Sequence, residues 1–277
     1  MAVPRPPKPT VGWRSVATPD ILVWKGKYYL YYQAFSEPSG TRGDWCPASA
    51  SWADSPDGPW TPANRAVIPT GKKGHWDQDA IHDPHPIIYK GKIYTYYKAA
   101  YNKWPDVRDR YMVGLGLAIA EDPLGPFVKS RLNPVLNSGH ETTFFPFKKG
   151  IAALVIKDGN ERSTIQYAED GVNFGIASVV SFVPIAAAPF TPDAFTDTKH
   201  GRGITWGLCH FIKAGTAGKR HSIIARFDCD LSLDVHDPWM KQNRVWHRPE
   251  VFFQQGLSKT QKEGIIRYNQ EFIERSK

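Results

Sequence analysis

Acidic residues recur along the chain at similar intervals. Asp20, Asp83, Glu141 and Asp193 follow one another at intervals of 63, 58 and 52 residues. Carboxyl groups that converge on one pocket can divide acid–base chemistry, because one donates a proton while another accepts one or activates water. The cleavage of a glycosidic bond requires such a pair, and a third carboxylate nearby raises the pKa of the proton donor.

Each of these residues also has a structural interpretation. Asp20 and Asp83 adjoin prolines and could simply cap turns where strands begin. His140 and Glu141 follow a glycine and precede the apolar run 144–147, so alone they would read as a surface turn. The recurrence of an acidic residue in successive units favours the functional interpretation. A histidine beside Glu141 adds a group that exchanges protons near neutral pH.

Two repeated phrases define the units. Residues 53–60, Ala-Asp-Ser-Pro-Asp-Gly-Pro-Trp, return as 120–127, and a looser copy follows at 168–174. Residues 19–32 return as 83–97, with two apolar runs around Lys-Gly-Lys, which predicts a hairpin. Units of roughly 40–65 residues with three or four short strands are typical of β-propeller blades.

We therefore predict an all-β fold, a β-propeller with four clear blades in one domain that spans residues 1–277. The fourth blade is expected to begin near residue 192. The tail adds strand-like segments and a possible C-terminal helix at 258–274. The predicted strands are 20–24, 28–33, 48–53, 86–89, 93–98, 113–120, 144–147, 151–156, 164–168, 203–211, 222–227, 244–246 and 251–254.

The composition narrows the range of functions. With 277 residues, 41% hydrophobic and 13% aromatic, the chain can bury a large core. The net charge of +8 comes from scattered Lys and Arg residues without a basic arm or stripe, so we expect no nucleic-acid partner, whereas a sulfated or acidic polysaccharide fits. Three cysteines without metal-type spacing predict no disulfide framework. We see no signal peptide and no membrane span.

Other polar residues are weaker candidates. His82 and His85 flank Asp83, but their spacing is a poor zinc signal. The polar segment 193–202 could contact a substrate, although a solvated loop is the default. His210 could point down the propeller axis toward water or an ion, or be an ordinary core histidine. The aromatic candidates for stacking on a sugar, most of which should pack in the core instead, are Trp13, Trp24, Trp45 and Trp76.

In several of the segments described above, the chain resembles glycoside hydrolase family 117. The resemblance covers most of residues 11–230. The segments that carry it are Thr18-Pro19-Asp20-Ile21-Leu22, His82-Asp83-Pro84, Ser138-Gly139-His140-Glu141, and residues 26–33, 114–126, 158–159, 164–168 and 206–208.

The resemblance implies both a fold and an activity. The family is similar in fold to glycoside hydrolase family 43, a five-bladed propeller. Its members are exo-acting α-1,3-(3,6-anhydro)-L-galactosidases, which release 3,6-anhydro-L-galactose from the non-reducing end of neoagarobiose and related agar oligosaccharides, with inversion. We therefore expect an agar-derived oligosaccharide as the substrate. No cofactor should be required, and a structural divalent ion on the propeller axis is compatible with the sequence.

The resemblance also assigns roles. Asp83 would be the carboxylate that tunes and stabilises, Glu141 matches the usual propeller acid, and His140 matches the family histidine proposed as proton donor. Asp20, at the start of the family's second blade, would lie close to the pocket and is the fourth catalytic candidate. Our candidates for substrate binding are Thr18, Gln33, Trp45, His82, Lys98, Asp193 and His210.

Two features of the family are not found in this sequence. The family's base lies on the first blade in an Arg-Asp-Pro-type motif, and its N-terminal helical extension makes dimer contacts. We therefore expect the chain to begin inside the first blade and to carry about four of the five. Its activity should be impaired unless Asp20 substitutes or a partner, for instance in a homodimer, supplies the missing blade.

Two alternative functions stay open at this point. A family 43-like arabinosidase or xylosidase would use the same scaffold, but a histidine beside the acid, as in 138–141, is less usual there. A non-catalytic sugar-binding propeller would bind without turnover. An inverting enzyme should instead hold its acid and base about 6.5–9.5 Å apart in one pocket.

Overall fold

The computed structural model describes residues 6–35, 46–101, 112–137, 139–156, 159–180, 184–212 and 222–232, and the single positions 263, 267, 270 and 274. Of the predicted helix at 258–274, these four positions have helical backbone and are exposed, and the other residues lie outside the described part. The predicted strands at 244–246 and 251–254 also lie outside it. No described helix is long and apolar enough to cross a membrane.

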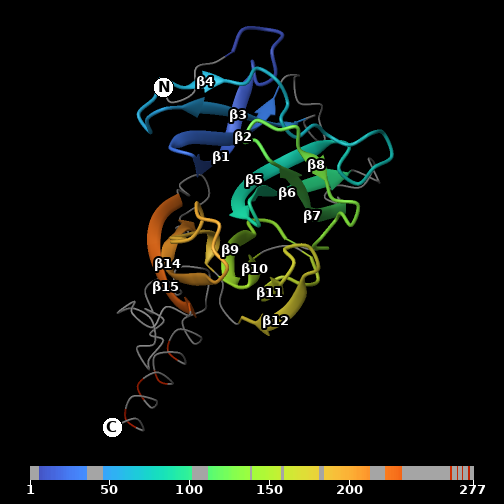
Figure 1. Ribbon diagram of the computed structural model, residues 1–277. Helices are drawn as coiled ribbons and strands as arrows, with labels where there is room; N and C mark the ends of the chain where they lie inside the picture. Colours follow the sequence, from blue (N-terminus) through green and yellow to red (C-terminus); the bar gives the residue numbers. More distant parts are fainter. Residues whose placement is uncertain are drawn as a thin grey trace.

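The described residues form antiparallel β-structure in four consecutive units (Figure 1). The first unit has the order β1-β2-β3-β4 and the second β5-β6-β7-β8. Their strands are β1 (Ser15–Trp24), β2 (Lys27–Phe35), β3 (Ala48–Ala53), β4 (Thr61–Pro62), β5 (Ala80–Tyr89), β6 (Lys92–Tyr101), β7 (Met112–Ala120) and β8 (Val128–Lys129).

A seven-stranded sheet contains the other two units. The third unit runs β9-β10-β11-β12, and the fourth has β14 between β13 and β15. The two are joined where Gly201 and Arg202, at the start of β14, pair with β9. The strands are β9 (Thr143–Lys148), β10 (Gly150–Val155), β11 (Thr164–Ala168), β12 (Gly175–Val179), β13 (Ile185–Pro189), β14 (Gly201–Ile212) and β15 (Ser222–Ser232).

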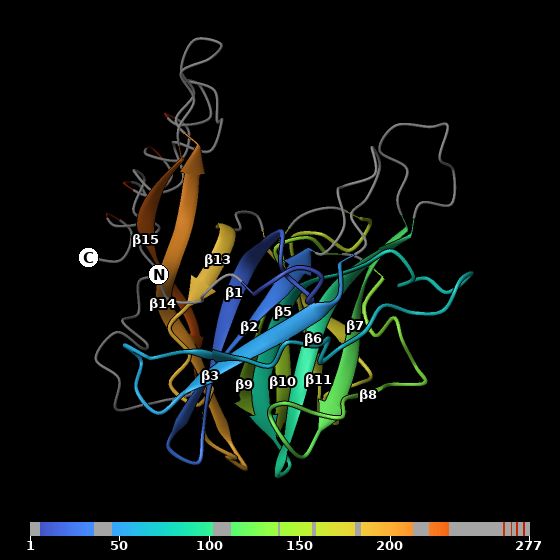
Figure 2. The same cartoon turned by 90° about the horizontal axis from the view of Figure 1, so that it is seen from above.

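The arrangement confirms the predicted all-β propeller-type fold with four blades in the described residues. Figure 2 shows the units grouped around their first strands, with the later strands of each unit fanning outward. The expected start of the fourth unit near residue 192 is wrong, because β13 already begins at Ile185. The sequence of β13, Ile-Ala-Ala-Ala-Pro, has neither the polar anchor nor the alternation by which the other first strands were found.

Tight hairpin turns give the first two units their register. Lys25 and Gly26 both have positive φ, 49° and 79°, and so do Lys90 and Gly91, 51° and 71°. Two successive positive φ angles define the two-residue turn that matches the twist of antiparallel strands, and glycine takes the second position without strain. The repeated Lys-Gly-Lys phrase is therefore a hairpin, as the sequence predicted.

Apolar faces of neighbouring units pack against one another. One buried cluster joins the first and second units and includes Leu22, Tyr31 and Ile81. A second cluster lies between the second and third units, where Tyr96 stacks on Phe144 with ring centroids 4.0 Å apart. A third contains residues of the third and fourth units. Since burial of apolar area is the main favourable term in folding, these interfaces hold the units together.

A repeated turn locks each of the second and third units onto the preceding unit. The hydroxyl of Tyr31 in the first unit donates to the carbonyl of Pro123, 2.6 Å away in the turn that follows β7. The hydroxyl of Tyr96 in the second unit donates to the carbonyl of Gly171, 2.7 Å away in the turn that follows β11. Burial raises the pKa of both tyrosines, so they remain donors at physiological pH.

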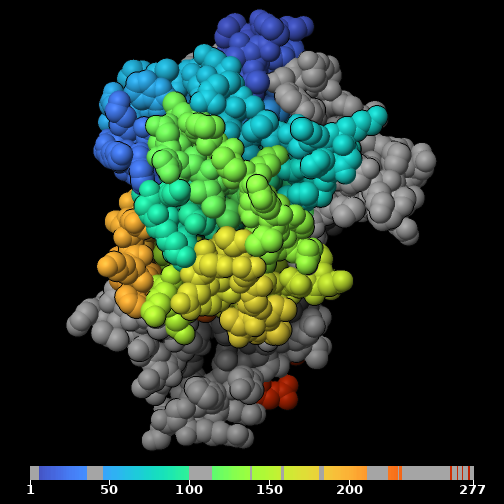
Figure 3. Space-filling view, turned by 45° about the vertical axis from the view of Figure 1, so that its right-hand side comes forward, coloured from blue at the N-terminus to red at the C-terminus, as the bar shows by residue number. Residues whose placement is uncertain are grey.

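An aromatic residue completes each lock. Phe127 meets the ring of Tyr31 edge-on with centroids 6.1 Å apart, and Phe174 meets Tyr96 edge-on at 5.9 Å. In Figure 3 the green atoms of the second unit lie against the blue and cyan first unit, and yellow atoms of the third unit lie against the green. The phrase repeated at 120–127 and 168–174 is therefore a device that joins units.

A polar contact ties three first strands together. His85 on β5 places Nδ1 2.7 Å from Oδ2 of Asp20 on β1, and Nε2 2.9 Å from the carbonyl oxygen of Phe144 on β9. A carbonyl oxygen only accepts, so Nε2 carries a proton, and the carboxylate favours a second proton on Nδ1. Burial lowers the pKa of His85, but the attraction and hydrogen bond of Asp20 outweigh it, and the pKa is raised.

The lock formed by Tyr96 can be tested by removing one oxygen atom. Tyr96→Phe keeps the stacked ring and leaves the carbonyl of Gly171 without its buried donor, so we expect the free energy of unfolding to fall by about 1–2 kcal/mol. Tyr94→Phe is the matched control on the same strand, because no hydrogen bond of its hydroxyl appears in the described part. Urea denaturation measures the free energy of unfolding of both variants. Equal losses of stability would show that the hydrogen bond of the Tyr96 hydroxyl does not stabilise the fold.

The contact of His85 should stabilise the fold more at acidic than at alkaline pH. Its folded pKa is raised, so the stabilisation is complete below about pH 6.5, the ordinary histidine pKa, and is lost as the pH rises through the folded pKa. His85→Gln should lower the free energy of unfolding by about 2 kcal/mol at pH 6 and by less at pH 9. The exposed His75 provides the control His75→Gln. A loss of equal size at both pH values would contradict a charged His85.

Candidate functional site

Each unit carries one strained residue at the beginning of its first strand. In β1 the register with β2 shifts between Ala17 and Asp20, and β5 and β13 show the same shift at the corresponding place. A residue with positive φ occupies each shift, and in the third unit such a residue stands just before β9. The four residues, with φ of 46°, 49°, 62° and 48°, are Thr18, Asp83, Glu141 and Ala186.

This strain points to a site. Positive φ is uncommon outside glycine and costs of order 1–3 kcal/mol, and residues held in such backbone cluster where a side chain must be aimed. A bulge in the first strand turns one side chain away from the regular alternation of the sheet. We call the set of Thr18, Asp83, Glu141 and Ala186 the bulge residues.

The prediction of Asp83 and Glu141 as equivalent residues is confirmed. In both units, pairing resumes two residues after the bulge residue, at His85 opposite Tyr96 and at Thr143 opposite Leu154. The interval of 58 residues between the two acids thus reflects the same place in neighbouring units.

Asp20 is not the bulge residue of the first unit, as we had expected. It pairs with Tyr31 two residues after Thr18 and therefore corresponds to His85. Its carboxylate is also engaged: Oδ2 contacts His85, and Oδ1 accepts from the backbone N–H of Ile21 at 2.7 Å. A shared Pro, Pro19 and Pro84, follows the bulge residue in both units and was the signal that would have given the right alignment.

Asp193 is likewise misplaced as the anchor of the fourth unit, where Ala186 is the bulge residue. Asp193 is buried in the segment between β13 and β14. Its carboxylate accepts from the backbone N–H of Arg202 at 2.7 Å and forms an ion pair with that guanidinium at 3.1 Å. The geometry gives this residue a structural task, which fixes the approach of β14 to the third unit.

Three of the candidates for substrate binding share one register position on the second strand of a unit. Gln33, Lys98 and His210 each lie opposite the residue that precedes the bulge residue. Leu154 pairs with Thr143, so the equivalent position in the third unit, two residues further along the chain, is Ile156, which is buried. Polar side chains at this place in three units therefore flank the bulge residues.

Lys98 and Asp83 form the charged part of the site. Nζ of Lys98 lies 2.9 Å from Oδ2 of Asp83, and the two side chains are 12% and 31% exposed. A half-buried ion pair is screened less than a surface pair, so Lys98 holds the carboxylate of Asp83 in place. The substrate contact predicted for Lys98 stays a prediction, while its contact with Asp83 is what the structure shows.

The corresponding pair in the first unit is neutral. Nε2 of Gln33 donates to Oγ1 of Thr18, and Gln33 is buried. The first unit thus has a hydroxyl and an amide where the second has a carboxylate and an ammonium. Such groups can exchange hydrogen bonds with sugar hydroxyls but cannot act as a base near neutral pH.

Glu141 is positioned by the neighbouring unit. The backbone N–H of Ala186 donates to Oε2 of Glu141 at 3.2 Å, so one bulge residue holds the side chain of another. The sequence could not indicate this contact, because Ala186 contributes only backbone. His140 precedes Glu141 as His82 precedes Asp83, which places a histidine beside each of the two acids.

Other predicted features find no test in the described residues. Trp45, a candidate for substrate binding, lies outside them. No group of three or more His, Cys, Asp or Glu side chains in the described part is arranged to hold a metal ion, and an axial ion stays a prediction. Together, the bulge residues and their neighbours offer the carboxyl groups of Asp83 and Glu141, a histidine before each of them, and the ammonium group of Lys98. This set of groups is suited to proton transfer.

Comparisons with known proteins give the family to which this chain belongs. No family model matches the chain, and no curated protein matches it. Among solved structures it is similar to Zg3597, a family 117 glycoside hydrolase produced by the marine bacterium Zobellia galactanivorans. The identity is 71% and the TM-score 0.78, over 93% of this chain and 74% of that one.

More distant structures share the fold alone. The GH32 β-fructofuranosidase BmSUC1 of Bombyx mori has a TM-score of 0.53 at 16% identity, over 79% of this chain and 46% of that one. A glycosyl hydrolase from Bacteroides ovatus has a TM-score of 0.55 at 12% identity, over 83% of this chain and 71% of that one. The strong likeness to Zg3597, together with the acids at the bulges, shows that this chain belongs to glycoside hydrolase family 117.

Proposed function

We propose that the activity is the exo-acting release of 3,6-anhydro-L-galactose from the non-reducing end of neoagaro-oligosaccharides, with inversion at the anomeric carbon. The observation that carries the proposal is the placement of Asp83 and Glu141 at equivalent bulges of neighbouring units, each preceded by a histidine. Membership of family 117 supports a glycoside hydrolase, and the substrate is the one that the sequence resemblance implied.

The geometry suggests how the roles are divided. Glu141, fixed by the N–H of Ala186, and the adjacent His140 form the proton-donating side of the site. Asp83, held in place by Lys98, stabilises the positive charge that develops on the sugar ring in the transition state. Thr18, Gln33, His82 and His210 are assigned to the recognition of sugar hydroxyls.

Asp20 has a supporting role in this proposal. Both of its carboxylate oxygens are engaged, one with His85 and one with the N–H of Ile21. To accept a proton from water, it would have to give up its contact with His85, which ties three strands together. We therefore assign Asp20 to the support of the site. With Glu141 as the acid and Asp83 as the stabilising carboxylate, no bulge residue is left to take the proton of the attacking water, so the base that inversion requires is not among them.

Sugar release tests the proposed reaction. The chain is incubated with neoagarobiose, and the anomer formed first is identified by proton NMR. We expect slow release with inversion, because the family's base motif is not found in the sequence, and Glu141→Gln should lower the rate further, about 10²–10⁴-fold, the usual contribution of a general acid. Glu121→Gln, at an exposed residue of the second unit, is the control. Turnover that yields the retained anomer, or full activity of Glu141→Gln, would contradict the proposal.

The ion pair of Lys98 gives a second test. Lys98→Met removes the group that holds Oδ2 of Asp83, so the carboxylate is no longer fixed where positive charge develops in the transition state. We expect kcat to fall about 10–100-fold, with KM changed less. Lys98→Arg should restore most of the activity.

Lys92→Met is the matched control for this test. Lys92 lies on the same strand and pairs with Glu121 at 3.1 Å, but that pair is exposed. Exposed pairs contribute about 0–1 kcal/mol, and this pair does not contact Asp83, so kcat should not change. If Lys98→Met raised KM while leaving kcat unchanged, Lys98 would be a residue that binds substrate and does not position Asp83.

A further inference from the structure

A hollow in the surface lies at the opposite end of the units from the bulge residues. Its volume is about 950 Å³, and turns of the second and third units line it together with the segment that leads into β14. Asp83 stands near the beginning of β5, whereas Tyr89, which lines the hollow, ends the same strand. We call this hollow the turn-end groove; it is separate from the site described above.

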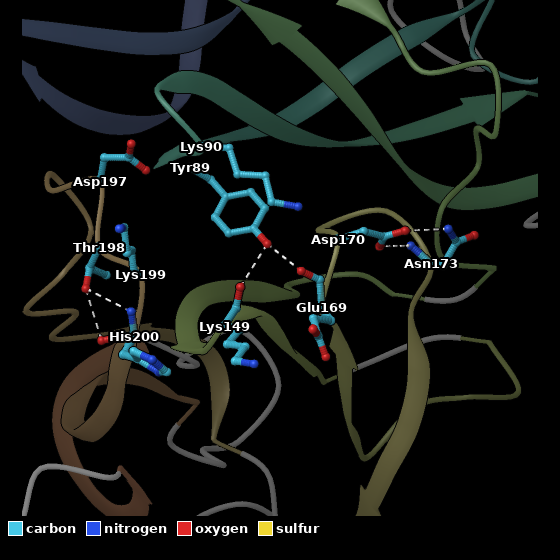
Figure 4. A pocket seen from close by; sticks show the side chains of 10 residues that line it. All are labelled: Tyr89, Lys90, Lys149, Glu169, Asp170, Asn173, Asp197, Thr198, Lys199 and His200. Carbon is cyan, nitrogen blue, oxygen red and sulfur yellow. Dashed lines mark hydrogen bonds between the residues drawn. The ribbon is translucent and has the colours of Figure 1, made fainter.

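The walls of the turn-end groove are tied together by hydrogen bonds of their own. The Tyr89 hydroxyl donates to the backbone carbonyls of Lys149, at 3.0 Å, and of Glu169, so it fixes two turns of the third unit (Figure 4). On the facing wall, the hydroxyl of Thr198 bonds both the carbonyl and the N–H of His200, at 3.0 and 3.2 Å. The groove therefore needs little ordering before a ligand binds, which lowers the cost of binding.

One carboxylate of the groove is fully occupied. Asp170 accepts hydrogen bonds from the backbone N–H groups of Val172 and Asn173, both at 2.8 Å, and from the side chain of Asn173 at 2.6 Å. These bonds outweigh its slight burial, and the pKa of Asp170 is lowered. Asp170 thus holds its turn in shape and does not compete for a ligand.

Lys90 lies over the ring of Tyr89, with Nζ 4.9 Å from the ring centroid, whereas four other charged groups of the lining have no ion-pair partner in the described part of the chain. Lys149 and Lys199 supply ammonium groups, and Asp197 and Glu169 supply carboxylates; no ion pair of any of the four is seen there. In Figure 4, Asp197 and Lys199 stand on one wall, and Glu169 and Lys149 on the other. Donors and acceptors therefore occur together on each side of the groove.

The balance of charges in the lining indicates which kind of ligand the groove can bind. With Lys90, the lining has three ammonium groups and, with Asp170, three carboxylates, so its formal charge cancels when His200 is neutral. A lining without net charge favours neither an anion nor a cation. A sugar hydroxyl both donates and accepts, so vicinal hydroxyls can satisfy a carboxylate and an ammonium at the same time.

We propose that the turn-end groove is a second saccharide-binding site, which holds a neutral oligosaccharide away from the centre of the reaction. The identity of the saccharide, a neutral agar oligosaccharide, rests on the proposed function. Such a site would keep the enzyme on a polymeric or branched source of its substrate while the bulge residues act on chain ends.

The test follows binding and does not depend on turnover. Backbone amide NMR is recorded for the chain carrying Glu141→Gln, with neoagarohexaose as the probe. We expect the amides of residues 89–91, 149–150 and 197–200 to shift, in addition to those around Asp83. In the double variant Asp197→Ala and Lys199→Ala, the affinity measured from the first group should fall about tenfold or more, because charged hydrogen bonds are lost. The double variant Lys27→Ala and Asp54→Ala, at an exposed ion pair, is the control.

The outcomes separate this inference from the proposed function. Shifts at 197–200 without shifts around Asp83 would support the groove and overturn the proposed substrate. Shifts around Asp83 alone, or at neither place, would overturn the groove. A sulfated oligosaccharide of the same length is measured in parallel. Binding of that probe more than tenfold tighter than neoagarohexaose would overturn the assignment of a neutral ligand.

Discussion

The burial of apolar sheet faces between neighbouring units is the constraint on which the rest of the structure depends. A sheet of three or four short strands has two faces, and one unit alone cannot cover both. Stacking the units side by side covers them, as the buried clusters around Tyr31 and around Tyr96 show. The same stacking brings the first strands of all units together, so residues more than fifty positions apart meet at the same end of the fold.

The site is a consequence of that convergence combined with one local defect. A regular first strand would alternate its side chains between the two packed faces and leave none aimed along the axis. The bulge breaks the alternation once in each unit, at a cost in backbone strain that the packed interfaces between neighbouring units outweigh. Because each bulge is built in the same way, the side chain at that position can be a hydroxyl, a carboxylate or a methyl group, and the residues beside it, such as Lys98 and His140, add to the chemistry of the site.

The sequence was sufficient to predict the units but not the alignment between them. Strands such as 48–53 and 164–168 were predicted to the residue, because apolar alternation and Pro/Gly turns fix their ends. Asp83 and Glu141 were found because an acid recurs at a constant place. Asp20 and Asp193 were assigned to the wrong position in their units because the prediction aligned the units by their acidic residues and not by their backbone geometry. The features that define equivalence are the positive φ and the register shift. In the sequence they are marked only by the proline that follows Thr18 and Asp83, and Ala186 has no such mark.

The two ends of each unit serve different purposes, and the physical reason lies in how they are built. At the beginning of the first strand, the chain is strained and its side chains are held by contacts from other strands, such as His85 with Asp20 and Ala186 with Glu141. That end is suited to chemistry, which needs fixed geometry. At the other end, turns carry the locks between units, and their backbone carbonyls accept from Tyr31, Tyr89 and Tyr96. Because carbonyls accept these hydrogen bonds, exposed charged side chains of the turns, such as those of Lys149 and Glu169, remain available to bind a ligand without weakening the fold.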